Sequence, residues 1–171
     1  ASVSAPAASE TPGVPTPGEP EPTLTAEARA ETAPALPNVC GPMFNADVTA
    51  QLEGIPLNDP AVGPTGLIAE GSLFCVWRNP AADTTAIATH IVYMSRGAAL
   101  DYLNELQDGD KKFTCYEARS GVRCEATWPD PTYPVTDGRT LFYRDGVLID
   151  STWSNLAPAG YTDSIIDYLF S

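Results

Sequence analysis

Apolar side chains recur at two different spacings along this chain. Residues 46–53, 96–107 and 161–170 place them three to four positions apart, which is typical of amphipathic helices. Asn45 and Ser95 directly precede the first two of these segments, and both residue types are favoured as helix N-caps. We therefore expect three helices over these ranges.

Most of the remaining apolar positions follow the pattern of β-strands. Arg119-Ser120-Gly121 and Asp145-Gly146 are turn signals between strand pairs, typical of hairpins. The order of elements predicts an α+β fold with an antiparallel sheet of about six strands and helices packed on one face. The predicted strands are 73–77, 84–94, 112–118, 122–128, 140–144 and 147–153.

Composition changes near residue 38. Residues 1–38 hold eight of the 17 prolines, five glutamates and no aromatic residue. Such a segment buries too little apolar surface to offset the entropy cost of ordering it. We predict a disordered Pro- and Glu-rich linker over residues 1–38, and a single disulfide-stabilised globular domain over residues 39–171.

The chain holds four cysteines, an even number. Their spacing does not fit a zinc knuckle, so disulfides in an oxidising compartment are expected. Four cysteines allow three pairings. We favour Cys40 with Cys75 and Cys115 with Cys124, because the second pair flanks a predicted hairpin.

Charge limits the classes of partner. With 22 acidic and 9 basic residues the net charge is −13, which argues against nucleic acid and against an anionic membrane surface. No stretch reaches the about 20 apolar residues that span a bilayer. The segment that starts at Ala1 has neither the charged n-region nor the apolar h-region of an export signal. We expect membrane contact only through a lipid anchor on a cysteine upstream of Ala1, with a freely secreted chain as the alternative.

Catalytic motifs are weak in this sequence. His90 is the only histidine and lies mid-strand without a Gly-x-Ser-x-Gly elbow, so we predict no enzyme activity. The Asp108-Gly109-Asp110 segment, or Asp130 with Asp137, offers oxygen ligands for calcium. Neither follows the EF-hand pattern and turn chemistry accounts for both, so we predict no metal and no cofactor.

One surface loop carries large aromatic side chains. Trp128 and Tyr133 flank prolines in the segment 128–134, and loops of this kind lie at the surface. Tryptophan and tyrosine are enriched at binding surfaces. We predict a binding site formed by Trp128, Asp130, Tyr133 and Asp137, suited to a basic or apolar protein partner.

The segment 40–53 and the strand Cys75-Val76-Trp77 resemble the uncharacterised actinobacterial secreted lipoproteins, in which a first cysteine introduces a helix and a second lies in a Cys-x-Trp strand. The chain is also similar to the broader set of envelope lipoproteins with a PsbP-like sandwich. The resemblance implies a cell-envelope domain, lipid-anchored or facing the cell wall, with a Cys40–Cys75 disulfide and no established enzymatic activity.

We therefore expect an extracytoplasmic accessory or docking subunit for a membrane or cell-wall protein complex. Two alternatives stay open. A carrier of a small apolar or lipid-like ligand would enclose an apolar cavity of about 300 Å³ or more. A hydrolase would need a polar cleft that joins His90 to an acid and a hydroxyl.

Overall fold

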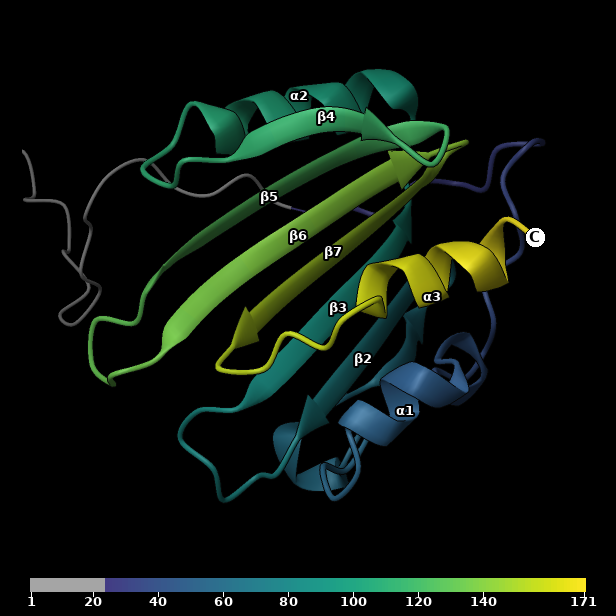
Figure 1. Ribbon diagram of the computed structural model, residues 1–171. Helices are drawn as coiled ribbons and strands as arrows, with labels where there is room; N and C mark the ends of the chain where they lie inside the picture. Colours follow the sequence, from purple (N-terminus) through teal and green to yellow (C-terminus); the bar gives the residue numbers. More distant parts are fainter. Residues whose placement is uncertain (1–23) are drawn as a thin grey trace, which may run out of the picture.

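The computed structural model describes residues 24–171, and within them seven strands form one antiparallel sheet in the order β1-β2-β3-β7-β6-β5-β4 (Figure 1). The strands are β1 (Gly66–Ala69), β2 (Ser72–Arg78), β3 (Ala86–Tyr93), β4 (Thr114–Ala118), β5 (Gly121–Pro129), β6 (Thr136–Arg144) and β7 (Val147–Ser154). The helices of the same part are α1 (Ala46–Gln51), α2 (Arg96–Gln107) and α3 (Tyr161–Leu169), with two short 3-10 helices, η1 (Gly41–Met43) and η2 (Pro60–Val62). The α+β class and the antiparallel sheet are confirmed.

The strand that the sequence pattern missed is β1, at the sheet edge. It has only four residues, and Leu67 and Ile68 are both 47% exposed, so it lacks the alternation of buried and exposed positions on which strand prediction depends. It is a strand because it pairs with β2, with Gly66 opposite Phe74. The sheet therefore has one strand more than predicted.

The helices lie on both faces of the sheet, which corrects the prediction of one covered face. Val147 and Ile149 belong to one apolar core with α1 and α3, whereas Leu148 between them belongs to a second core with α2. Alternate residues of a strand point to opposite faces. Figure 1 shows α1 and α3 side by side, apart from α2. The three consecutive buried residues 91–93 at the end of β3 indicate a strand that is covered on both faces.

All four cysteines are paired as predicted, Cys40 with Cys75 and Cys115 with Cys124. The second disulfide joins directly opposite residues of β4 and β5. The hairpin turn is one residue shorter than expected, because Ala118 pairs with Gly121. Two disulfides fit an extracellular or secreted protein.

Residues 24–36, called here the N-terminal strap, pack along the body. The Glu27 amide donates to the Tyr93 carbonyl at 2.8 Å, and Ala33 is only 2% exposed. The Tyr93 hydroxyl donates to the Pro34 carbonyl at 3.0 Å and accepts from the Leu36 amide at 3.1 Å. Residues 24–36 therefore pack on the body, although the linker was predicted over residues 1–38, and residues 1–23 of that predicted linker lie outside the described residues.

Candidate functional site

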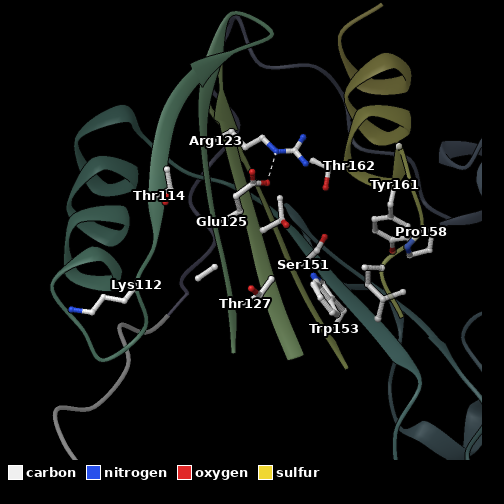
Figure 2. A pocket seen from close by; sticks show the side chains of 15 residues that line it. Lys112, Thr114, Arg123, Glu125, Thr127, Ser151, Trp153, Pro158, Tyr161 and Thr162 are labelled. Carbon is white, nitrogen blue, oxygen red and sulfur yellow. Dashed lines mark hydrogen bonds and ion pairs between the residues drawn. The ribbon is translucent and has the colours of Figure 1, made fainter. Parts of the chain in front are cut away.

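A groove of about 540 Å³ lies on the face of the sheet that carries α1 and α3 (Figure 2). We call it the α3 groove. Its floor is formed by β6 and β7, one side by β4 and β5, and the other by α3 with the residues just before it. The lining side chains that matter below are Thr114, Arg123, Glu125, Thr127, Thr140, Ser151, Trp153, Tyr161 and Thr162.

A row of polar side chains crosses the floor at right angles to the strands. Thr114 on β4 is opposite Glu125 on β5, and Glu125 is opposite Thr140 on β6. Thr140 is opposite Ser151 on β7, and Ser151 is opposite Thr89 on β3. Because directly opposite residues of antiparallel strands share a face, these five side chains form one transverse line of hydroxyl and carboxylate groups.

The buried end of this row is a chain of three hydroxyl groups. The Thr89 hydroxyl lies 2.8 Å from the Ser151 hydroxyl and 2.9 Å from that of Tyr161. Burial raises the pKa of Tyr161 far above its usual value, so this group remains a neutral hydroxyl. Either hydroxyl of each pair can donate, so the three groups form one continuous chain of hydrogen bonds.

An indole ring lies beside the row. Trp153 on β7 is opposite Gly138 on β6, and the next strand places Thr127 opposite Gly138. A Cβ atom at Gly138 would come within 2.2 Å of the Trp153 Cζ2 atom. The ring therefore covers the glycine backbone, and glycine at this position lets it lie low over the sheet.

Ion pairs join α3 to the β4–β5 hairpin at one end of the groove. Arg119 pairs with Asp163 at 3.4 Å and with Asp167, while Arg123 reaches Asp163 at 3.7 Å. Side chains of the Arg119 pairs are more than two fifths exposed, and such pairs contribute little stability. Their effect is to hold the two sides of the groove, α3 and the β4–β5 hairpin, next to each other.

Among residues 24–171, Glu125 is the one acidic residue that lines the groove. Both of its carboxylate oxygens are engaged. One accepts from the Tyr116 hydroxyl at 2.8 Å. The other accepts from Arg123 Nε at 3.1 Å (Figure 2). The charges of Arg123 and Glu125 therefore compensate each other, and Lys112 is the other charged residue of the described lining.

A separate buried cluster occupies the opposite face, under α2. Arg139 donates to both carboxylate oxygens of Asp150, at 2.9 and 2.7 Å. Tyr102 donates to Asp150 at 3.0 Å and accepts from Arg139 at 2.7 Å. Burial and the nearby Asp150 charge raise the pKa of Tyr102. These contacts tie α2 to the sheet.

His90 lies on the same face and lines a cavity of about 350 Å³ with Tyr102 and Asp150. Its ring stacks on Phe74, with centroids 4.2 Å apart. Burial lowers the pKa of His90, against a smaller opposing effect of the Asp150 charge. The Asp150 carboxylate and the Tyr102 hydroxyl are bonded to Arg139 and to each other, and Thr152 is the second hydroxyl residue that lines this cavity.

The four residues predicted as a binding site are only partly brought together. Trp128 is directly opposite Asp137, on the same face as His90, and the Lys111 ammonium lies 4.5 Å from the centre of the Trp128 ring. Asp137 is opposite Trp128, and the next residue of β6, Gly138, is opposite Trp153. Because neighbouring residues of a strand point to opposite faces, Trp128 and Trp153 lie on opposite faces of the sheet.

Asp130 and Tyr133 belong to the turn at the end of β5. Asp130 Oδ1 accepts from the amides of Thr132 and Tyr133 at 2.7 and 2.8 Å, and these bonds lower the pKa of its carboxyl. Asp130 therefore shapes the turn. Tyr133 is 40% exposed, whereas Trp128 is half-buried with Lys111 over its ring.

Sequence reasoning missed the α3 groove because its floor comes from strands distant in the sequence. A local signal was present, since Arg123, Glu125 and Thr127 place polar groups at every second position of β5. The residues opposite them become visible only when the register is known.

No group of three or more His, Cys, Asp or Glu side chains that would hold a metal ion occurs in residues 24–171. The two calcium candidates at Asp108-Gly109-Asp110 and at Asp130 with Asp137 form no such group in this part of the chain. Over the same residues, no helix has the length and apolar character needed to cross a membrane.

Comparison with known proteins gives no relative for this chain. No protein-family model matches it, and no curated protein or solved structure shows a significant similarity.

Proposed function

We propose that this chain is a non-enzymatic binding domain that works outside the cytoplasm and recognises its partner through the α3 groove. The observation that carries this proposal is the transverse polar row beside the Trp153 ring, in an open groove. Binding surfaces combine an aromatic anchor with a few placed polar groups in the same way.

The chemistry of the groove favours recognition over catalysis. Glycoside hydrolysis uses two facing carboxyl groups, and Glu125 is the acidic group among the described lining residues. All four cysteines are in disulfides, and the chain's one histidine, His90, lies on the opposite face. A nucleophile in the groove would therefore lack a histidine base.

The groove also favours docking over transport of an apolar ligand. A carrier for a lipid-like molecule encloses a pocket lined mostly by apolar side chains. The α3 groove instead presents Thr114, Thr127 and Thr140 together with the Arg123–Glu125 pair. Such a lining suits a ligand rich in hydrogen-bonding groups.

The two disulfides support a place outside the cytoplasm. Within that compartment we propose a cell-envelope role, as an accessory subunit of an envelope assembly, with attachment through a lipid anchor upstream of Ala1 or free secretion as the two forms. Attachment would raise the effective concentration of the groove near its partner, so that weak binding suffices.

The test is co-sedimentation of the purified full chain with the cell-envelope fraction of the organism that makes it. Thr127→Arg places a long side chain in the groove from an exposed position on β5. We expect this variant to lower the bound fraction about tenfold, the effect of about 1.4 kcal/mol.

Thr132→Arg is the matched control, because it makes the same change at another exposed threonine, in the turn that the sequence predicted as the binding site. It should bind like the wild-type chain. Loss of binding in Thr132→Arg with retention in Thr127→Arg would move the site to the turn, and no binding by the wild-type chain would refute the proposed function.

A further inference from the structure

The α3 groove has a nearly neutral floor that is dense in hydroxyl groups. Thr114, Thr140 and Ser151 contribute three of them along the transverse row. The anionic group of the row, Glu125, is bonded to the neighbouring Arg123 at 3.1 Å. Lys112 is the other charged residue of the described lining, so the row itself fits a ligand that both donates and accepts hydrogen bonds.

The backbone of the floor is already fully used by the sheet. β6 pairs with β5 on one side and with β7 on the other. A peptide that binds as an added strand needs a free sheet edge, which supplies most of its affinity through main-chain hydrogen bonds. Such an edge is absent at β6, so a peptide lying over the floor would depend there on side-chain contacts, and the free edge nearest the groove is that of β4.

The Trp153 ring adds a flat apolar surface at the side of the row. Because Gly138 has no side chain, the ring lies low over β6, and its indole is half-buried in the groove lining. A sugar ring has a face made of C–H groups that packs against an aromatic ring, while its hydroxyl groups point outward from the ring edge. The distance between neighbouring strands brings Thr127 and Thr140 beside this surface.

The hydroxyl chain at the buried end of the row offers one further directional contact. Ser151 and Tyr161 both line the groove and are 1% and 4% exposed. With Thr89 they share two hydrogen bonds and hold three hydroxyl protons. A ligand group that reaches Ser151 can donate to this hydroxyl or accept from it, because a hydroxyl has one proton and two lone pairs.

We infer that the α3 groove binds a carbohydrate chain, with one sugar ring stacked on Trp153 and its hydroxyl groups bonded to the transverse row. This inference rests on the proposed function, because it names the class of ligand for the same groove. A protein segment is the competing occupant.

The experiment repeats co-sedimentation of the full chain with envelope fractions treated in two ways. Periodate cleaves vicinal diols and so destroys most sugar rings, while proteinase K removes proteins. We expect periodate to lower binding about tenfold and proteinase K to leave it within about twofold. Loss of binding after proteinase K overturns the carbohydrate assignment while leaving the proposed function intact, and absence of binding to the untreated fraction refutes the proposed function itself.

Two tryptophan variants locate the contact. Trp153→Leu should lose the periodate-sensitive binding about tenfold, whereas Trp128→Leu, the same change on the opposite face of the sheet, should keep it. Thr140→Val preserves side-chain shape and removes one hydroxyl of the row, so about fivefold weaker binding is expected from the loss of one hydrogen bond. Wild-type binding by both Trp153→Leu and Thr140→Val would exclude a sugar at this position.

Discussion

Trp153 lies so close to Gly138 that no other residue fits beneath the ring. A Cβ atom at position 138 would approach Trp153 Cζ2 to 2.2 Å and Cε2 to 2.4 Å. The two residues are directly opposite on β7 and β6. The glycine therefore sets the height of the ring above the floor of the α3 groove.

Gly138→Ala should displace the Trp153 ring. The added methyl group overpacks the contact, for which about 1–3 kcal/mol of destabilisation is expected. Ligand binding in the groove should fall with it, because the ring no longer lies flat. Urea unfolding followed by tryptophan fluorescence measures the first effect and co-sedimentation measures the second.

Gly97→Ala is the control for this substitution. Gly97 lies in α2, and nothing is within 4 Å of the position a Cβ would take. Alanine in a helix is favoured over glycine by about 1 kcal/mol, so this variant should be at least as stable as the wild-type chain. Equal behaviour of the two variants would contradict the contact between Gly138 and the ring.

Tyr93 holds the N-terminal strap against the body of the domain. Its hydroxyl donates to Pro34 and accepts from Leu36, so Tyr93→Phe removes two hydrogen bonds that fix the N-terminal strap. We expect a loss of about 1–3 kcal/mol in the free energy of unfolding and faster proteolysis within residues 24–36. Tyr116→Phe, which removes an exposed hydroxyl contact with Glu125, should stay within about 0.5 kcal/mol. A strap cleaved equally fast in both variants would show that Tyr93 does not fix it.

Local sequence patterns predicted most of the helices and strands, whereas pairing between distant segments determines how these elements assemble. The helix expected at 96–107 after Ser95 has the same bounds as α2, and the Ser95 hydroxyl accepts from the Ala98 amide. Both disulfides were predictable because one of them flanks a short hairpin. Such signals act over a few residues, where sequence reasoning is strongest.

The strap and the groove show where local reasoning ends. Residues 24–36 hold no aromatic residue and their apolar residues are mostly alanine, yet Ala33 fits under the body because small residues need little space, and composition carries no sign of this. The α3 groove depends on the register that sets Thr140 between Glu125 and Ser151. No single segment contains that information.

The buried Arg139–Asp150 pair gives a third prediction. Asp150→Ala would leave the Arg139 guanidinium, whose side chain is 12% exposed, without its carboxylate. Removal of one partner of a buried pair costs about 3–5 kcal/mol. The double variant Arg139→Met with Asp150→Leu removes both charges and should lose less stability than Asp150→Ala alone. Denaturant unfolding of the three chains checks this order, and a double variant less stable than the single one would contradict it.

Disulfide reduction gives a fourth prediction. By the chain-entropy relation, the Cys40–Cys75 bond, which spans 35 residues, contributes about 3.8 kcal/mol, and the Cys115–Cys124 bond, which spans 9, about 2.7 kcal/mol. Replacing Cys40 and Cys75 together by alanine should therefore lower the melting temperature more than replacing Cys115 and Cys124. Calorimetry of the two double variants decides the order. An unchanged melting temperature after reduction of the wild-type chain would show that neither bond supports the fold.

The last prediction uses the chain's single histidine as a pH probe. Burial holds the pKa of His90 in the folded chain below its ordinary value of 6.5. Protonation therefore favours the unfolded chain, whose His90 binds a proton more readily. The contribution of neutral His90 to stability is complete above pH 6.5 and is lost as the pH falls through the folded-state pKa.

His90→Gln should remove this part of the acid destabilisation, so unfolding free energies measured between about pH 7.5 and about pH 5 should fall less steeply in the variant than in the wild-type chain. The stacking contact with Phe74 is lost at every pH and shifts both ends of the curve equally, so the slope isolates the proton. Parallel curves would mean that His90 titrates alike in the folded and unfolded chains.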